Sequence, residues 1–390
     1  MKPLIPLVFL LAVLCACERM SFRSEGDRID PGKSSHSLYC SAFVYPDGYD
    51  WRKDSLAGDV PVKLMLFDRK DTLLSLDVGG EYLVGADADM HRIIGGALYC
   101  DFSTSTQTVV SRNGIEIFRY DGRECMTGFA LRGSDVYTLG SARSGSGWSF
   151  RKNGELILGR ETGAVMGGLY EDGDSLCFAF YEPITSGFKV VGKRYYCACG
   201  SKVTQVVPGA DVTEIYALRM YGSQVNYLAS STNIKGILWQ SGWATMLMDS
   251  GNALAIRAHG FILAGDTLYA FAQRRTSFWW SDTFWRGSRI EEDTGDFSQV
   301  YAIRDGSPSL CYVYSRNGTP SGVGLYFNGR RTALPEKYIM PCSSAYCCKE
   351  KTCCVGLNDT DTKDCRPLVI NGVDTLEYSF NGYFTGLCLP

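Results

Sequence analysis

Short apolar stretches recur along the chain, and polar or glycine-rich turns separate them. The clearest set begins at Met126, and its strand candidates in order are Met126–Leu131, Val136–Leu139, Trp148–Lys152 and Glu155–Leu158. Runs of this length, rich in β-branched and aromatic residues and bounded by turn residues, are typical of β-strands. The dipeptide Asn153-Gly154 favours a type I′ turn, because Asn and Gly tolerate positive φ best. The segment therefore predicts four successive antiparallel strands.

This four-strand unit repeats over most of the chain. A hairpin turn between the third and fourth strands recurs eight times, at Arg69-Lys70, Asn113-Gly114, Asn153-Gly154, Gly192-Lys193, Ser241-Gly242, Arg286-Gly287, Asn328-Gly329 and Asn371-Gly372. The starts of the second strands give the same count and, after a longer first interval, a spacing of about 38 to 50 residues. A period of this length with four strands per repeat is the signature of a β-propeller. We expect an all-β fold with eight blades; seven is the alternative, because the insertion 45–60 makes the first unit irregular.

The C-terminal segment is expected to close the ring. The first unit lacks a first strand, and Tyr383–Leu389 matches Met126–Leu131, with Thr385-Gly386 aligned on Thr127-Gly128. A C-terminal strand that completes the first blade would remove the free sheet edges of an open array.

The run Val-Tyr…Gly…Trp…Lys-Asn-Gly-Glu-Leu-Ile-Leu that ends at Leu158 resembles the Trp-x-x-x-Asn-Gly propeller repeats of exported Bacteroidales lipoproteins. The resemblance extends over roughly residues 38–390, and it is strongest in the units with turns at Asn153, Asn328 and Asn371. It implies an envelope lipoprotein with a propeller domain and implies little about activity.

The N-terminus predicts export and a lipid anchor. Lys2 precedes the apolar run Pro3–Leu14, which has the form of a secretory signal. Leu14-Cys15-Ala16-Cys17 resembles a bacterial lipobox, with Cys17 as the lipidated residue; an ordinary signal peptide is the alternative. We therefore expect a signal peptide at 1–16, a flexible tether at 17–37 and the propeller at 38–390. The expected location is the bacterial cell envelope, at the outer membrane, on its periplasmic face or the cell surface.

Net charge and cysteine content bear on possible partners and on disulfide bonds. The formal net charge is −3, so bulk electrostatics do not suggest nucleic acid as a partner. Sixteen cysteines in an exported chain favour disulfide bonds. In a hairpin over 347–354, Cys347 would face Cys354 and Cys348 would face Cys353, so one of these pairs could bond. A bond between Cys40 and Cys388 would lock the closing strand to the first blade. The alternative is that most cysteines are small buried apolar residues.

Catalytic chemistry has little support in the sequence. Only three histidines are present, and no nucleophile motif or pair of carboxylates stands out. No metal or cofactor is expected, because adjacent cysteines on one hairpin point apart and do not converge on a zinc ion.

Tryptophans give the strongest surface candidates. Trp279, Trp280 and Trp285 lie within ten residues of one another, and Trp243 lies one unit earlier. Exposed indole rings stack on sugars or peptide side chains. The alternative is that these aromatic residues pack between blades; because adjacent strand residues face opposite ways, at least one of Trp279 and Trp280 should then still leave the core. The leading hypothesis is therefore a non-catalytic binding or scaffold lipoprotein that recognises a glycan, a peptide or a partner protein at a propeller rim. The alternative is a glycan-active hydrolase or lyase that uses loop carboxylates at the central channel.

Overall fold

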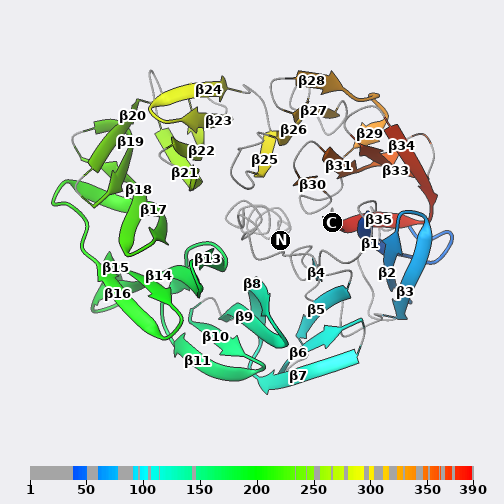
Figure 1. Ribbon diagram of the computed structural model, residues 1–390, viewed down its shortest axis with the longest axis horizontal. Coiled ribbons are helices and arrows are strands. Elements are labelled where there is room, and N and C mark those ends of the chain that lie inside the picture. Colours follow the sequence, from blue (N-terminus) through cyan, green and yellow to red (C-terminus); the bar gives the residue numbers. More distant parts are fainter. Residues whose placement is uncertain are drawn as a thin grey trace, which may run out of the picture. The chain divides into compact units, whose positions relative to one another are not determined.

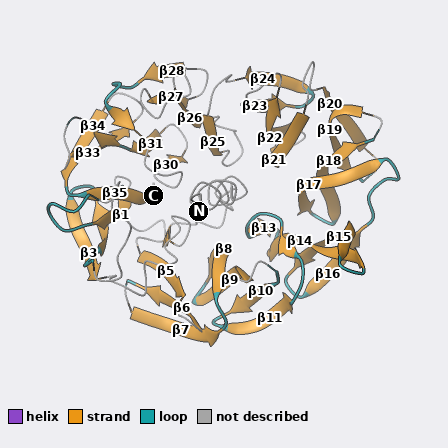
Figure 2. Ribbon diagram, turned by 180° about the vertical axis from the view of Figure 1, so that it is seen from behind, coloured by secondary structure: helices purple, strands orange, loops and turns teal. Residues whose placement is uncertain are grey.

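The computed structural model is drawn in Figures 1 and 2. It describes residues 38–50, 60–77, 91–94, 97–103, 107–113, 115–142, 146–232, 234–242, 244–249, 255–264, 267–275, 280–293, 298–302, 311–315, 323–327, 330–339, 346–349, 352–359, 361, 365–370 and 374–388. The regular secondary structure of these residues consists of β-strands. None of the described residues belongs to a helix long and apolar enough to cross a membrane.

The described residues fall into two compact units. One is the continuous segment Thr162–Asp293. The other combines the described parts of Glu25–Glu161 and Thr294–Pro390. Each unit is built from antiparallel sheets, and nearly all neighbouring strands follow one another in the chain.

The unit 162–293 contains three sheets, drawn in green to yellow in Figure 1. The first consists of β12 (Ala164–Val165), β13 (Tyr170–Asp172), β14 (Ser175–Ser186), β15 (Lys189–Cys199) and β16 (Lys202–Val206). The second consists of β17 (Val212–Tyr221), β18 (Gln224–Ser231), β19 (Ile234–Ser241) and β20 (Ala244–Asp249). The third consists of β21 (Ala255–Ala264), β22 (Thr267–Arg275), β23 (Trp280–Arg286) and β24 (Arg289–Asp293).

The other unit contains five four-stranded sheets and one short pair among its described residues. The first two are β1 (Tyr39–Val44), β2 (Lys63–Asp68) and β3 (Asp71–Asp77) with β35 (Gly382–Cys388), and β4 (His91–Ile94), β5 (Ala97–Ser103), β6 (Gln107–Arg112) and β7 (Ile115–Asp121). The third is β8 (Glu124–Arg132), β9 (Asp135–Ala142), β10 (Trp148–Lys152) and β11 (Glu155–Arg160). The remainder are β25 (Ser298–Ala302), β26 (Cys311–Ser315), β27 (Val323–Phe327) and β28 (Arg330–Ala333); β30 (Tyr346–Lys349), β31 (Thr352–Gly356), β33 (Cys365–Ile370) and β34 (Asp374–Ser379); and the pair β29 (Tyr338–Ile339) and β32 (Asn358–Asp359).

These sheets confirm the all-β prediction and the repeated four-strand unit. Consecutive strands pair by short turns, which is how a propeller blade is built. At the turn Asn153-Gly154, φ is 51° and 86°, as a type I′ turn requires. Arg69 and Asn113 also have positive φ at the predicted turns of their units.

The C-terminal strand completes the first sheet, as the sequence predicts. The strand order is β3-β2-β1-β35, and β35 pairs antiparallel with β1 from Tyr39↔Cys388 to Val44↔Gly382. Phe384 and Leu387 of β35 pack in one core with Ala42 of β1 and Leu368 of β33. Burial of apolar side chains therefore stabilises this pairing in addition to the backbone hydrogen bonds.

The predicted turn at Gly192-Lys193 is wrong, because both residues lie inside β15. The turns of this sheet lie at Gly187, between β14 and β15, and at Gly200, after β15; both glycines have a φ of 60°. β14 and β15 span 12 and 11 residues, whereas β16 has only 5. Gly192-Lys193 therefore lies in the part of the β14–β15 hairpin that extends beyond β16.

Candidate functional site

The predicted tryptophan rim lies mostly outside the described residues. Trp243 and Trp279 are not among them, and of Trp280 the structure gives only the strand position, paired with Arg275. Trp285 is completely buried, and its indole N–H donates to Thr283 Oγ1 at 3.2 Å. The small side chain of Ala270 opposite Trp285 makes room for the ring. The expectation that Trp285 presents a ring face to a ligand is therefore wrong.

The predicted cysteine pairing is right in register for one hairpin. Cys347 pairs with Cys354 and Cys348 with Cys353, and Cys354 is buried. The side chains of Cys347, Cys348 and Cys353 lie outside the described set.

The expected bond between Cys40 and Cys388 is wrong. Cys388 pairs with Tyr39, one position away from Cys40, so the two cysteines do not face each other directly. The Cys40 thiol is free, and it donates to the hydroxyl of Tyr378 at 3.5 Å. Burial raises the pKa of this thiol to about 12.

The disulfide bond found among the described cysteines joins Cys177 to Cys199. They sit directly opposite each other on β14 and β15, with their Cα atoms 4.1 Å apart. The neighbouring pair is hydrogen-bonded, since Gly200 N donates to Leu176 O. Cys177 and Cys199 therefore occupy a non-hydrogen-bonded site, where antiparallel strands approach most closely. Because the two cysteines are 22 residues apart, no local sequence pattern predicted this pairing.

A buried polar cluster joins the sheets β4–β7 and β8–β11 around the carboxylate of Glu124. Oε2 accepts hydrogen bonds from Tyr120 Oη at 3.1 Å and Ser149 Oγ at 2.6 Å, and Oε1 accepts one from Arg151 Nη2 at 3.4 Å. The Arg151 guanidinium also lies over the Tyr120 ring, 4.0 Å from its centroid. Burial and the Glu124 carboxylate raise the pKa of Tyr120. Gly140 leaves room for the carboxylate, because a Cβ there would lie 2.4 Å from Oε2.

The Glu124 cluster is better suited to structure than to catalysis. Glu124 is only 8% exposed, and both of its carboxylate oxygens are engaged by side chains of the protein. A glycosidase carboxyl group must instead face the substrate in an open cleft, opposite a second carboxyl group. The cluster satisfies a buried charge where two sheets meet.

A two-stranded ribbon at Glu182–Arg194 is the most distinctive surface feature that the structure describes. β12 pairs with β14 only as far as Tyr181, and β16 pairs with β15 only from Tyr195 onward. Between these points β14 and β15 pair with each other alone. The ribbon therefore extends the hairpin past the four-stranded part of its sheet.

The tip of the ribbon is apolar and exposed. The Phe188 side chain is fully exposed, and Val190 and Val191 are each 63% exposed. The register shifts between Ile184 and Thr185, which leaves Val191 as the extra residue of a β-bulge. Such a bulge re-aims side chains locally and lets two neighbouring residues face outward.

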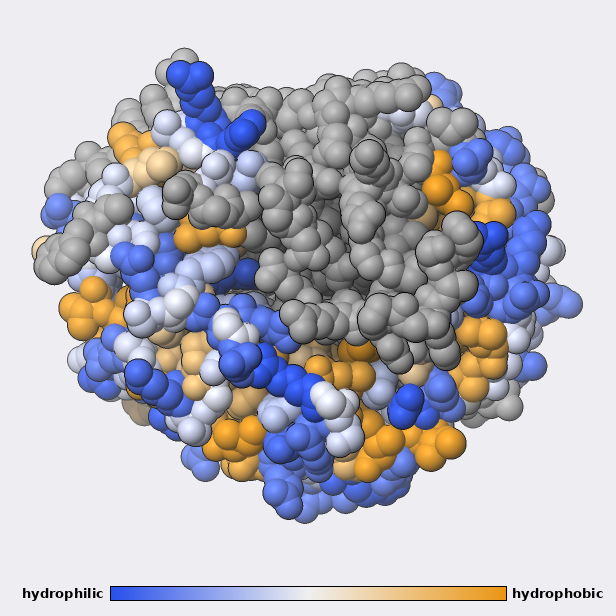
Figure 3. All heavy atoms as spheres, viewed as in Figure 1, coloured by the Kyte–Doolittle hydropathy of each residue, from blue (hydrophilic) through white to orange (hydrophobic). Residues whose placement is uncertain are grey.

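Other exposed apolar residues are more dispersed. They lie singly or in pairs, at Leu73, Ile115, Ile117, Leu156, Ile157, Val207 and Leu247. On the face drawn in Figure 3, apolar groups of the described residues are small and separated by polar ones. Scattered exposure of this kind is normal for soluble proteins, but three exposed apolar residues at one hairpin tip call for an explanation.

The base of the ribbon is fixed to the next sheet. Lys193 Nζ lies 2.8 Å from Glu214 Oε1 on β17 and 4.6 Å from the centre of the Tyr181 ring. The Tyr195 hydroxyl accepts a hydrogen bond from the backbone N–H of Ile215 at 3.2 Å. These contacts hold the base while leaving the tip open, which is the arrangement of a binding element on a rigid support.

Comparisons with known proteins give structural neighbours only. No protein-family model matches the sequence, and no curated protein matches it either. The β-propeller domain of the Trilobed protease from Pyrococcus furiosus, described as having an open velcro topology, is similar with a TM-score of 0.45 and 9% identity. The match covers 81% of this chain and 95% of that domain.

Two further structures are similar at comparably low identity. The N-terminal domain of Nup159 matches with a TM-score of 0.36 and 10% identity, over 94% of this chain and 99% of that one. A GH43_1 enzyme from Xanthomonas citri complexed with xylose matches with a TM-score of 0.24 and 11% identity, over 56% of this chain and 88% of that one. What the described residues themselves show is an all-β chain built from repeated four-stranded antiparallel sheets.

Proposed function

We propose that this chain is an exported lipoprotein, anchored through Cys17, whose domain is a single closed propeller of eight blades. The lipobox-like Leu14-Cys15-Ala16-Cys17 supports the anchor. The repeated four-stranded sheets and the pairing of β35 with β1 support the closed ring. Several acyl chains on one cysteine would hold the domain at the outer membrane without a spanning helix.

The function is non-catalytic binding of a partner protein through the Glu182–Arg194 ribbon. The observation that carries this proposal is the exposed tip of Phe188, Val190 and Val191 on a hairpin that extends past its sheet. Burying one such side chain in a partner contributes about 1.5–3 kcal/mol. An aromatic anchor of this kind is typical of the centre of a protein interface.

The charges of the ribbon indicate the chemistry of the partner surface. Lys189, Lys193 and Arg194 oppose one acidic residue, Glu182, so the ribbon carries a formal charge of +2. Lys189 and Arg194 are exposed, whereas Lys193 is engaged by Glu214 at the base. The partner is therefore expected to present an apolar pocket with an acidic rim.

Site-specific photocrosslinking in living cells tests this proposal. A benzophenone amino acid replaces Phe188 in one variant and Leu247 in a matched control. Leu247 is also apolar and exposed, but it lies on the edge strand β20. We expect a discrete protein adduct from position 188 and none from position 247. The purified partner should then bind the wild-type chain, with at least tenfold weaker binding after Phe188→Ser.

Three results would contradict the ribbon proposal. Equal adducts from both positions would indicate random collision. Binding of the protein to vesicles of phosphatidylethanolamine and phosphatidylglycerol, lost in Phe188→Ser, would make the ribbon a lipid-contacting element. Binding of a glycan that Trp279→Ala or Trp280→Ala abolishes, with Phe188→Ser unaffected, would return the binding site to the tryptophan rim, and cleavage of that glycan would make the protein an enzyme.

A further inference from the structure

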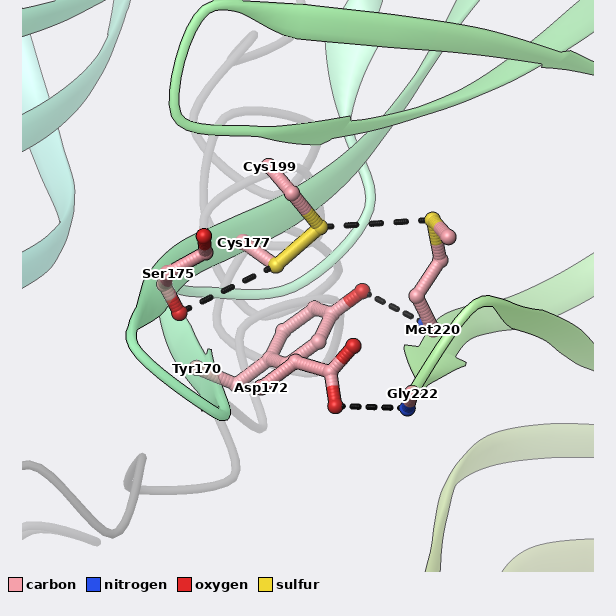
Figure 4. The surroundings of a disulfide bond; sticks show 7 residues. All are labelled: Tyr170, Asp172, Ser175, Cys177, Cys199, Met220 and Gly222. Atoms are coloured by element: carbon pink, nitrogen blue, oxygen red, sulfur yellow. Dashed lines mark hydrogen bonds between the residues drawn. A yellow bond between two sulfur atoms is a disulfide. The ribbon is translucent and has the colours of Figure 1, made fainter.

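Four side chains with metal-binding atoms meet at the Cys177–Cys199 disulfide (Figure 4). One carboxylate oxygen of Asp172 and the two sulfur atoms lie within 4.8 Å of one another. The thioether sulfur of Met220 lies 4.0 Å from Cys199 Sγ. Asp172 comes from β13, the cysteines from β14 and β15, and Met220 from β17.

We propose that reduction of the disulfide converts this cluster into a copper(I) site, in which the Cys177 and Cys199 thiolates and the Met220 thioether are the ligands. Soft sulfur ligands of this kind select Cu(I) over harder cations. This site is independent of the proposed ribbon interface.

The sulfur positions suit a three-coordinate metal. In a trigonal site with metal–sulfur bonds of about 2.3 Å, the sulfur atoms lie about 4 Å from one another. Met220 Sδ already has this separation from Cys199 Sγ. The Cα atoms of the two cysteines are 4.1 Å apart, so their sulfurs can separate to a similar distance by rotation about χ1 once the bond is broken.

The backbone around the cluster is held in place without the disulfide. The Tyr170 hydroxyl accepts a hydrogen bond from Met220 N at 2.7 Å, and Asp172 Oδ1 accepts one from Gly222 N at 2.7 Å (Figure 4). These two bonds fix β13 to the end of β17. The Met220 thioether therefore stays beside the cysteines when the sulfur–sulfur bond opens.

A metal can reach the site from solvent. Cys199, Met220 and Asp172 are all partly exposed, whereas Cys177 is buried. The partial exposure of Cys199 and Met220 leaves two of the three sulfur ligands accessible to a metal ion.

The chemistry balances with a dithiol reductant and Cu(I) as the two reagents. A dithiol transfers two electrons and two protons to the disulfide, which gives two cysteine thiols and the oxidised cyclic disulfide of the reductant. Cu(I) then displaces the two thiol protons and takes a lone pair from each sulfur. Copper does not change oxidation state in this step.

The test measures Cu(I) binding to the full chain under anaerobic conditions, after reduction with excess dithiothreitol and its removal. Bicinchoninate serves as the competing coloured chelator for Cu(I). We expect the doubly substituted Cys177→Ser/Cys199→Ser protein to bind one Cu(I) fewer than the wild type. Met220→Leu should weaken this one site at least about tenfold. Asp172→Asn, which keeps an oxygen acceptor for Gly222 N, should leave the affinity unchanged.

Controls separate this site from the other cysteines of the chain. Cys197→Ala changes a buried cysteine of the same strand that is outside the ligand set, and it should keep the full copper count. The wild type without reduction should lack the site, a comparison that needs no substitution. An equal copper count in the reduced wild type and the double variant would overturn the proposal. Weakened binding in Asp172→Asn with unchanged binding in Met220→Leu would also overturn it, because the site would then suit a harder ion such as Zn²⁺.

Discussion

Ser41 and Thr385 are 344 positions apart in the sequence, yet their hydroxyl oxygens lie 2.9 Å apart and share a hydrogen bond between β1 and β35. Both side chains are completely buried. We expect Thr385→Val to lower the free energy of unfolding by about 1–3 kcal/mol, because it leaves the Ser41 hydroxyl buried without this partner.

Denaturant unfolding measures this effect. The double variant Ser41→Ala/Thr385→Val removes both polar groups and should be more stable than Thr385→Val alone. Equal stability of Thr385→Val and the wild type would show that the bond contributes nothing to the attachment of β35.

Trp285 and Phe188 give a matched pair of large aromatic residues, one completely buried and one fully exposed. Trp285→Ala leaves a cavity against Ala270 and Phe261 and should cost about 3–5 kcal/mol of unfolding free energy. Phe188→Ala should change stability by less than about 0.5 kcal/mol, because the ring is fully exposed. Thermal unfolding of both variants checks this difference, and similar losses in the two would contradict it.

Gly140 and Glu124 are expected to be energetically coupled. The Cβ of Gly140→Ala would lie 2.4 Å from Glu124 Oε2, so the carboxylate would have to leave Ser149 and Arg151. We expect a loss of about 1–3 kcal/mol. In a double-mutant cycle, Gly140→Ala should cost much less when Glu124 is already Ala. Additive effects would show that Gly140 acts in some other way.

Cys40 should make the protein sensitive to alkali. Burial, with a smaller effect of the Asp68 charge, raises the pKa of its thiol from about 9.0 to about 12, while the Tyr378 hydroxyl opposes the shift. Between pH 9 and 12 the unfolded chain loses this proton and the folded chain keeps it. The contribution of the neutral Cys40 thiol to folding stability is therefore fully present below pH 9 and is lost as pH rises toward 12.

Unfolding measured in urea from pH 8 to pH 10.5 tests this dependence. Stability should fall less steeply with pH in Cys40→Ala than in the wild type. In that variant the Tyr378 hydroxyl keeps its hydrogen bond to the Arg69 carbonyl, so the comparison isolates the thiol. Identical slopes would mean that Cys40 does not titrate differently in the two states.

Local signals in the sequence were sufficient to predict the repeated four-stranded sheets. Asn153-Gly154 specifies its own turn through two positive φ values, and the match between Tyr383–Leu389 and Met126–Leu131 identified the strand that pairs with β1. Such features depend only on neighbouring residues or on the repeat, so they can be recognised without the fold.

The ribbon and the Cys177–Cys199 disulfide could be recognised only from the structure. Gly192 has the position of a turn glycine within the repeat. The turns lie instead at Gly187 and Gly200, because β15 is long enough to include Gly192. The pairing of Cys177 with Cys199 follows from that length, because a turn at Gly192 would have placed other residues opposite Cys177. The prediction of an exposed Trp285 failed because the pairing of β23 with Ala270 and Ala272 of β22 determines which face of β23 is buried.

The order in which the sheets can form during synthesis follows from the place of β35. The strands of most sheets leave the ribosome as one continuous segment, so these sheets can form while the chain is still emerging. The sheet of β1 begins first and finishes last, because its fourth strand ends at Cys388. Until then one edge of β1 is without its partner strand and can pair with other chains. Emergence of β35 is therefore the step that covers this edge, and a chaperone that protects β1 would act before it.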